Sequence, residues 1–414
     1  MLKQIPWNCL HWLGFSGFVV IALNGCALER QSSTQELSPE VDNSTTGSTP
    51  EPVPALSTPK EFAPSAEDYF RVETVVEGLE VPWSIEFLPD GSMLVAEQPG
   101  RLRRIRDGQL DPQPVAGLPA ILSRGEGGLM DIALHPEFDE NQWLYLSYTV
   151  NGEGGDLRTR VSRFRLTDQG LIDQLDIFAG VPGTAGATHF GSRLAFGSDS
   201  TLYVTLGERG DPNRAQDLQN LNGKTLRLND DGTIPDDNPY VGRSDARPEI
   251  FSFGHRNAQG IAIQPGTGLV FQTEHGPSGY DGPQGGDEIN IVEAGKNYGW
   301  PNISYNQQAP GQLPPLILYD EALAPAGATF YTGEAFPQWQ NDFFFANLRD
   351  QSLIRVVLNG FEVVGQEKLL HRQYGRLRDV KHGPDDFLYI ATSDNDTYGA
   401  GRVGGDRIIR LVPN

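Results

Sequence analysis

The chain has 414 residues, of which 38% are hydrophobic and 21% are charged, a globular composition with ample material for a hydrophobic core. Its formal net charge of -22 at pH 7 opposes binding to nucleic acid and to anionic membrane surfaces. The 48 glycines and 30 prolines indicate many turns and favour an all-β fold.

Residues 1–26 have the pattern of a lipoprotein-type signal peptide. Lys3 precedes an apolar run, which ends in Leu23-Asn24-Gly25-Cys26, a sequence similar to a bacterial lipobox. A plain secretory signal and an uncleaved anchor are the alternatives, although the run is short for a membrane span. We therefore expect an exported, periplasmic protein that contacts a bacterial membrane only through a lipid on Cys26. Both cysteines lie in this leader, so the rest of the chain has no disulfide.

Residues 27–66 are rich in serine, threonine, proline and glutamate. They contain too few apolar side chains to offset the entropy of ordering the chain. This composition predicts a disordered, flexible tether, followed by a single folded domain over residues 67–414.

A pattern of turn, apolar strand and polar loop then occurs six times. The six copies are Leu88–Glu97, Leu134–Tyr148, Phe196–Glu208, Gln264–Glu274, Phe336–Asn347 and His382–Thr392. Turn residues before a β-branched and aromatic run are a hairpin signal. Their number and spacing predict a six-bladed β-propeller with four-stranded antiparallel blades and long insertions. A pair of β-sandwiches is the alternative fold, but it explains the repeat less well.

The stretch from Glu274 to Pro301 is a long loop-like segment, and it is glycine-rich and acidic. Carboxylates beside free main-chain carbonyls suit Ca²⁺, which takes six to eight oxygen ligands. Tyr298 and Trp300 add an aromatic wall that could hold a flat ligand. A polar surface loop is the other interpretation, but loops of this length in compact domains are usually functional or disordered.

One histidine and several arginines are candidates for chemistry. His189 precedes the third copy, and histidine is the side chain most readily poised as a base near neutral pH, although a lone histidine is more often structural. Arg376 and Arg378 alternate before the sixth copy, which places both on one strand face. With Arg349 from the preceding blade they form a candidate anion site, because guanidinium groups match carboxylates; surface ion pairing is the alternative.

These residues occur in motifs that resemble the pyrroloquinoline quinone (PQQ)-dependent aldose sugar dehydrogenases of the soluble glucose/sorbosone dehydrogenase family. The resemblance covers about Val75 to Val412, and the motifs occur in the order of the family. They are Glu126–Pro136, His189–Arg193, Gly223–Leu228 with Ile234–Pro239, Gly254–Asn257, Glu274–Pro277, Asp287–Asn290, Asn297–Pro301 and Arg376–Val380. The family fold is a six-bladed propeller, which agrees with the repeat count.

The resemblance implies a reaction and roles for two catalytic residues. His189 would take the proton from the anomeric hydroxyl of an aldose, and a hydride would pass from that carbon to the C5 carbonyl of the quinone. Arg256 and Asn257 would contact the quinone oxygens, where negative charge develops. An external electron acceptor, either a quinone or a redox protein, would then reoxidise the cofactor.

The resemblance also implies the cofactor and metal contacts. Arg349, Arg376 and Arg378 would hold the carboxylates of PQQ, and Tyr298, Gly299 and Trp300 would border its ring. For Ca²⁺, Gly276 and Pro277 would supply main-chain carbonyl ligands, with Glu274 and Tyr298 in the same region, and the metal would polarise the quinone.

Three departures from the family pattern refine this expectation. Glu126, a candidate cofactor contact, stands where many relatives have glutamine, and Thr188 stands where the glucose-specialised branch has an acidic residue. The later-blade insertion of that branch, associated with dimers, is also absent. We therefore expect a monomeric enzyme with broad aldose specificity.

Two other functions remain open from the sequence. The first is a Ca²⁺-dependent propeller lactonase, which would use the acidic loop and a histidine but not the arginines. The second is a cofactor-free propeller that binds a glycan or a protein partner.

Overall fold

The structure is a computed structural model that describes residues 62–63, 67–180, 182–401 and 405–414. All of these residues lie in one compact unit, Val53–Asn414. The leader 1–26 and nearly all of the tether 27–66 lie outside the described residues, so both remain predictions. In the tether, Ala63 donates its main-chain N–H to the carbonyl of Gln366 at 2.9 Å.

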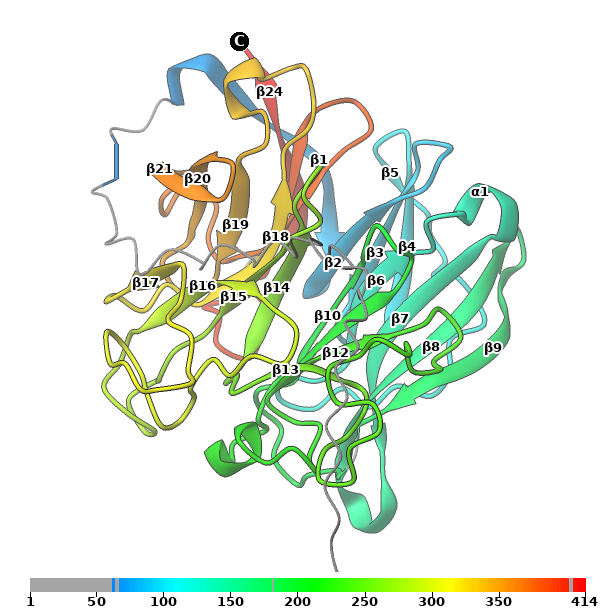
Figure 1. Cartoon of the computed structure of the whole chain (residues 1–414). Helices are drawn as coiled ribbons and strands as arrows, with labels where there is room; N and C mark the ends of the chain where they lie inside the picture. The colour runs from blue at the N-terminus through cyan, green and yellow to red at the C-terminus, as the bar shows by residue number, and fades with distance from the viewer. Residues whose placement is uncertain (1–61, 64–66, 181, 402–404) are drawn as a thin grey trace, which may run out of the picture. The chain divides into compact units, whose positions relative to one another are not determined.

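Within the described residues, the β-strands form six four-stranded antiparallel sheets, which are the blades of a propeller (Figure 1). Blade 1 contains β2 (Pro82–Phe87), β3 (Met93–Glu97), β4 (Arg101–Arg106) and β5 (Gln109–Leu110). Blade 2 contains β6 (Leu129–Leu134), β7 (Trp143–Asn151), β8 (Leu157–Thr167) and β9 (Gly170–Ala179). Blade 3 contains β10 (Gly191–Phe196), β11 (Leu202–Leu206), β12 (Lys224–Leu228) and β13 (Ile250–Phe253). Blade 4 contains β14 (Ala258–Ile263), β15 (Val270–Glu274), β16 (Asp287–Val292) and β17 (Ile317–Tyr319). Blade 5 contains β18 (Pro325–Phe330), β19 (Phe343–Asn347), β20 (Ser352–Asn359) and β21 (Glu362–Leu369). Blade 6 contains β22 (Leu377–His382), β23 (Leu388–Thr392), β24 (Asp406–Pro413) and β1 (Phe70–Leu79).

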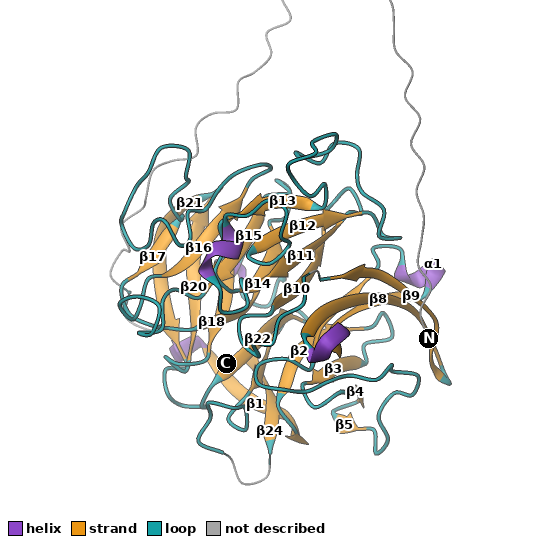
Figure 2. Cartoon of the chain, turned by 90° about the horizontal axis from the view of Figure 1, so that it is seen from below, coloured by secondary structure: helices purple, strands orange, loops and turns teal. Residues whose placement is uncertain are grey.

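The first strands of consecutive blades lie side by side around a closed ring, with β22 next to β2. The prediction of a six-bladed β-propeller with four-stranded antiparallel blades is therefore confirmed. Short helical turns lie in the connections between strands (Figure 2). They are η1 (Glu67–Tyr69), α1 (Phe138–Asn141), η2 (Glu153–Gly155), η3 (Pro212–Ala215) and η4 (Pro337–Trp339). Of the helices in the described part of the chain, none has the length and apolarity that a membrane crossing requires.

The six sequence repeats correspond to the second strands of the six blades, β3, β7, β11, β15, β19 and β23. Five of these strands are buried at every residue, and β7 is buried along its middle. The reason is that a blade is covered on both faces by its neighbours, so its second strand is apolar without alternation. Most buried side chains accordingly form clusters between adjacent blades.

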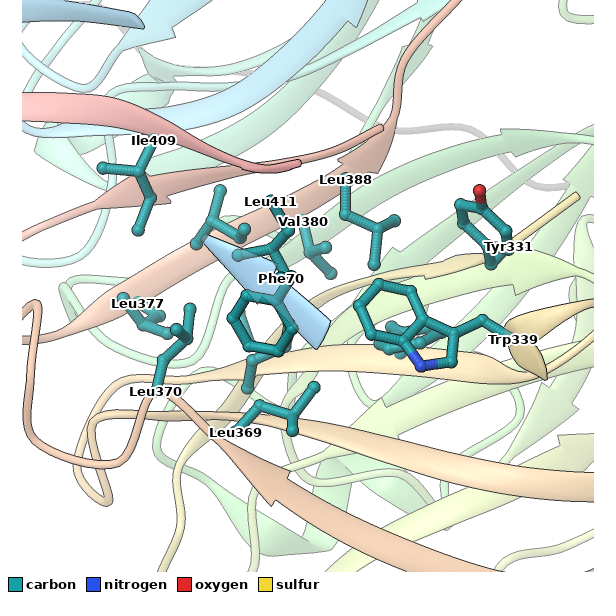
Figure 3. Close-up of a cluster of buried hydrophobic side chains, with 14 of the residues drawn as sticks. Phe70, Tyr331, Trp339, Leu369, Leu370, Leu377, Val380, Leu388, Ile409 and Leu411 are labelled. Carbon is teal, nitrogen blue, oxygen red and sulfur yellow. The ribbon is translucent and has the colours of Figure 1, made fainter. Parts of the chain in front are cut away.

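The ring is closed by pairing the first strand of the chain with the last. β1 pairs antiparallel with β24, from Phe70 opposite Pro413 to Leu79 opposite Asp406. Figure 3 shows the ring of Phe70 among side chains of blades 5 and 6, including Trp339, whose ring centroid lies 5.9 Å away. β1 therefore takes part both in the sheet hydrogen bonds of blade 6 and in the hydrophobic cluster between blades 5 and 6.

All six first strands meet at the guanidinium of Arg193 in β10. It pairs with Asp131 of β6 at 3.2 Å and with Asp379 of β22 at 3.0 Å, and Nε donates to the carbonyl of Gln259 in β14 at 2.7 Å. The same group lies 4.1 Å from the ring centroid of Trp83 in β2. At Gly327 of β18 a Cβ atom would overlap Asp379 and Arg193, so this close approach requires glycine.

Candidate active site

The candidate site lies at the face of the propeller where the first strands begin, here called the site face. In an antiparallel blade, the start of the first strand is next to the end of the second strand, so both ends contribute residues. The predicted residues lie at these strand ends: Glu126 before β6, His189 before β10, Arg256 and Asn257 before β14, and Arg376 before β22. A connected set of hydrogen bonds links blades 2, 3, 4 and 6 across this face.

His189 is buried and is held at both ring nitrogens. Its Nδ1 lies 2.7 Å from Oε1 of Glu208, and its Nε2 lies 2.9 Å from the hydroxyl of Tyr280. The main-chain N–H of His189 donates to Oε2 of Glu126 at 2.7 Å. Because a carboxylate accepts from Nδ1–H, these partners assign the proton to Nδ1 and leave the Nε2 lone pair facing a hydroxyl. This is the arrangement of a base ready to take a hydroxyl proton.

Glu208 was not singled out from the sequence, although it is buried and holds the orientation of the His189 ring. Its second oxygen accepts the main-chain N–H of Gly210. A signal was present in the repeats, because the copies in blades 1, 3 and 4 all end in glutamate, at Glu97, Glu208 and Glu274. Two of these acids meet a histidine, Glu208 at His189 and Glu274 at His255, and the sequence could not show these pairings.

Arg256 is buried, and it meets a segment of the long loop in its own blade. Its Nε donates to Oδ2 of Asp281 at 2.8 Å, and its Nη2 donates to Oγ of Ser278 at 3.2 Å and to the hydroxyl of Tyr280 at 3.4 Å. The guanidinium carbon lies 5.6 Å from the ring centroid of Trp300. Arg256 and His189 are thus linked through one residue, Tyr280.

Arg376 and Arg378 meet at one carboxylate, as expected for side chains on the same strand face. Nη2 of Arg376 lies 2.8 Å, and Nη2 of Arg378 3.4 Å, from Oδ2 of Asp396. Arg378 also donates to Oε1 of Gln259 at 2.6 Å, and burial lowers its pKa to about 10. Arg349 differs from this pair, because its side chain is exposed and its main-chain N–H donates to the carbonyl of Leu323.

Arginine side chains lie at the centre of the site face, where each has a carboxylate partner. Burial, together with the nearby charges of Arg256 and Arg378, holds the pKa of His275 well below its ordinary value, so this ring is neutral. Among the described residues, Nε of Arg378 and Nε1 of Trp300 are buried without a hydrogen-bond partner. Unpartnered buried donors beside cations are suited to an anionic ligand with several acceptor oxygens.

Glu126 connects blades 2, 3 and 6. Besides accepting from the main chain of His189, it accepts a hydrogen bond from the hydroxyl of Tyr398 at 3.1 Å. Its nearby negative charge contributes to raising the pKa of Tyr398 to about 12, after burial, which is the larger cause. Glu126 therefore positions the histidine backbone, whereas its predicted contact with a cofactor stays a prediction.

Four residues were predicted to bind a metal, and the structure gives most of their polar atoms partners in the protein. Glu274 accepts from Nδ1 of His255 at 2.8 Å and from the main-chain N–H of Arg256. Tyr298 stacks on His255 with a centroid distance of 4.8 Å, and its hydroxyl donates to the carbonyl of Ile291 at 2.6 Å. Within the described residues, no group of three or more histidine, cysteine or carboxylate side chains is arranged for a metal ion.

The main-chain groups of Gly276 and Pro277 form the base of the long loop. The N–H of Gly276 donates to Oδ1 of Asp287 at 2.7 Å, and the carbonyl of Pro277 accepts from the N–H of Gly285 at 3.2 Å. Asp287 also accepts from the N–H groups of Leu323 and Ala324 at 2.6 and 2.8 Å, so it fixes this turn against blade 5.

The remaining predicted residues lie close to Arg256. The Oδ1 of Asn257 accepts from the N–H of Gly191 at 3.1 Å, which links blades 3 and 4. The N–H of Gly299 donates to Oδ1 of Asn297 at 2.9 Å, and that of Trp300 donates to the carbonyl of Gly254 at 3.0 Å. Gly299 has a φ of 91° and lies against Ile303, so glycine is required there.

The structure thus defines a six-bladed propeller that gathers a histidine–glutamate pair and several arginines at one face. The family model "Glucose / Sorbosone dehydrogenase" matches residues 79–400. The chain belongs to this family and is an oxidoreductase that acts on sugars. The resemblance indicated by the sequence motifs is thereby confirmed.

Individual relatives support this assignment. The chain is 38% identical over 341 residues to "Aldose sugar dehydrogenase YliI" of Escherichia coli, which covers 78% of this chain and 90% of the relative. Among solved structures, an oxidoreductase described as a glucose dehydrogenase from Thermus thermophilus is 44% identical, with a TM-score of 0.75 over 83% of this chain and 100% of that one. The PQQ-bound aldose sugar dehydrogenase of Streptomyces coelicolor is 30% identical, with a TM-score of 0.72 over 83% and 98% of the two chains.

Proposed function

We propose that this chain oxidises aldoses at the anomeric carbon to lactones, with PQQ as the hydride acceptor, Ca²⁺ as a second cofactor and His189 as the general base. The observation that carries the proposal is the geometry of His189, whose Nδ1 is held by Glu208 while its Nε2 faces a hydroxyl. Membership of a sugar dehydrogenase family and likeness to a PQQ-bound neighbour support the reaction class and the cofactor.

In this role, Nε2 of His189 takes the proton of the anomeric hydroxyl while the hydrogen on the same carbon leaves with its electron pair. The aldose loses two electrons and two hydrogens, and the product is the lactone. Glu208 stabilises the imidazolium that forms, because its carboxylate remains hydrogen-bonded to Nδ1. Glu126 fixes the backbone of the base through the main-chain N–H.

The site residues fit PQQ, a planar quinone that carries carboxylates. When bound, PQQ supplies the two-electron acceptor for the hydride. Arg376 and Arg378 would hold its carboxylates, and the unpartnered Nε of Arg378 supports this role. Arg256 and Asn257 would contact the quinone oxygens, and Trp300 would border the ring. Binding of the anion would require Arg256 to exchange its present partner, Asp281.

For Ca²⁺, the carbonyls of Gly276 and Pro277 are the donors that we propose. Main-chain carbonyls are hard oxygen ligands of the kind that Ca²⁺ prefers, but two are fewer than its usual six to eight. Further oxygens would have to come from PQQ and water, since Glu274 and Tyr298 already have partners in the protein. A chelator should therefore remove the metal readily and weaken retention of PQQ.

Substrate range and location complete the proposal. Thr188, rather than an acidic residue, precedes the base, and we propose broad activity on aldoses in a monomer that passes electrons to an external quinone or redox protein. We also propose export and lipidation at Cys26. Mature protein from the native host should carry an acyl mass on Cys26 as its first residue; a soluble protein beginning elsewhere would contradict the lipid anchor.

The test of the function is reconstitution. PQQ and Ca²⁺ are added to the purified chain, the absorbance of the bound quinone is recorded, and oxidation of glucose and xylose is followed with a dye acceptor. The proposal expects stoichiometric uptake of PQQ and lactone production from several aldoses. A chain that takes up PQQ but oxidises no aldose, or that opens lactones without PQQ, would refute the proposal.

A further inference from the structure

The segment Ser278–Asp281, here called the lid segment, lies against the two residues to which the proposed function assigns the chemistry. Tyr280 contacts the atom of His189 that must receive a proton, at 2.9 Å from its hydroxyl to Nε2. Oδ2 of Asp281 accepts a hydrogen bond from Nε of Arg256 at 2.8 Å, and Oγ of Ser278 accepts one from Nη2 of the same arginine at 3.2 Å. The rings of Tyr280 and His189 also lie nearly parallel, with centroids 6.3 Å apart.

These contacts resemble those that ligands would make. A hydroxyl on Nε2 of His189 stands where the anomeric hydroxyl of a sugar would bind. A carboxylate on Arg256 stands where an anionic, oxygen-rich cofactor would place negative charge. The lid segment therefore satisfies two buried groups, which would otherwise be costly to leave unpaired.

The lid segment can leave without disturbing the core. Its loop is fastened at its base by the hydrogen bond from Gly285 to Pro277 and by the bond from Gly286 N–H to the carbonyl of Tyr319 at 2.8 Å. Beyond this base, Gly279 has a φ of 97° and open space around it. Tyr280 is 69% exposed, so displacing its ring uncovers little apolar surface.

We propose that the lid segment is a self-competing gate, in which Tyr280 and Asp281 occupy the places of the sugar hydroxyl and of the anionic cofactor and must be displaced before either ligand binds. This inference rests on the proposed function. If ligands bind only to the open form, the closed form reduces the association rate and the affinity by the same factor and leaves the dissociation rate unchanged. A residue that touched the bound ligand would show the opposite pattern, because its loss would speed dissociation.

The first experiment needs no cofactor, so its result does not depend on the proposed function. Diethyl pyrocarbonate modifies neutral imidazoles, and mass spectrometry of peptides gives the rate at His189. Removing the Tyr280 hydroxyl in Tyr280→Phe should raise this rate about three- to tenfold, and Tyr280→Ala should raise it further. His255, which is fully buried, is the internal control and should react slowly in every variant. An unchanged rate at His189 in both variants would overturn the gate.

The second experiment measures PQQ binding to the Ca²⁺-loaded chain by stopped-flow tryptophan fluorescence. Tyr280→Phe and Asp281→Asn should each raise the association rate and the affinity several-fold by the same factor, with no change in dissociation. Tyr240→Phe is the matched control, because the Tyr240 hydroxyl donates to the carbonyl of Gly295 at 3.1 Å and has no contact with the lid segment. Faster dissociation in the lid variants, or an equal gain in Tyr240→Phe, would overturn the proposal. If the wild-type chain takes up no PQQ, the proposed function fails, while the histidine modification still decides whether the gate exists.

Discussion

At the scale of single residues, the site depends on carboxylates that hold other groups in place. Glu208 orients the ring of His189, Glu126 fixes its backbone, and Asp396 gathers Arg376 and Arg378. Only Glu126 among these acids was a candidate from the sequence. The others could not be identified, because a carboxylate at a strand end is recognisable as a positioning group only when its partner in another part of the chain is known.

Glu208→Gln should lower turnover between about 10- and 10⁴-fold, because the neutral amide stabilises an imidazolium poorly. The KM for the sugar and the affinity for PQQ should stay close to wild type, since Glu208 faces His189 and not the ligands. Steady-state kinetics on the reconstituted chain measure turnover and KM separately. Glu97→Gln, at the equivalent strand end of blade 1, is the matched control and should keep its turnover. A rise in KM with unchanged turnover would show that Glu208 is not a positioning residue for the base.

Arg376 and Arg378 give a second prediction at this scale. Replacing both by alanine should weaken PQQ binding by at least about 100-fold, because charge-assisted hydrogen bonds contribute about 1.5–3 kcal/mol each. Arg243→Ala is the control, because Arg243 pairs with Asp245 at an exposed position, and it should not weaken binding. Equilibrium titration followed by quinone absorbance compares the variants, and equal affinity in the double mutant and the wild type would remove this pair from the cofactor site.

At the scale of elements, the second strands of the blades could be identified from the sequence, and the fourth strands could not. β3, β11, β15, β19 and β23 are buried at every residue, and each begins with apolar residues directly after a turn. Outer strands such as β21 carry mixed patterns of burial, which leave a weak signal. The ring closure by β1 could not be predicted either, because pairing of Phe70 with Pro413 has no local signature.

Phe70 connects this closing strand to the core of blades 5 and 6. Phe70→Ala should lower the free energy of unfolding by about 3–5 kcal/mol, the usual cost of removing a buried phenylalanine ring. Denaturant unfolding should show a lower midpoint with an unchanged slope. Phe361→Ala, at an exposed site, should change stability by less than about 0.5 kcal/mol. A similar small effect at Phe70 would mean that β1 is not part of the cooperative fold.

At the scale of the whole molecule, one ion cluster joins the blades beneath the site. Arg193 contacts first-strand residues from around the ring, and burial raises the pKa of Asp379 to about 6 despite this arginine. The motif His189–Arg193 placed Arg193 near the site. Its ion pairs with Asp131 and Asp379 could not be predicted, because they form only when the blades close into a ring. The sequence thus predicted the number of blades, but not the contacts between blades.

The raised pKa of Asp379 gives a pH dependence with a definite sign. Because the folded chain binds this proton more tightly than the unfolded chain, the contribution to stability is complete below about pH 4 and is lost as the pH rises through about 6. The difference in unfolding free energy between wild type and Asp379→Asn should therefore fall by up to about 3 kcal/mol over this range. Denaturant unfolding of both proteins at a series of pH values measures this difference in unfolding free energy. Asp245→Asn, at an exposed ion pair, should show no such trend, and a flat difference for Asp379→Asn would contradict the assignment.

The measurement that tests the central claim most directly is the turnover of His189→Ala after reconstitution with PQQ and Ca²⁺. Loss of the base should lower aldose oxidation by about 10²–10⁴-fold, the usual contribution of a positioned proton acceptor, while quinone absorbance shows that the cofactor is still bound. Folding should be unchanged, because His189 faces polar partners of the site and not an apolar cluster between blades. A His189→Ala chain, loaded with PQQ, that oxidises glucose or xylose at the wild-type rate would contradict the account.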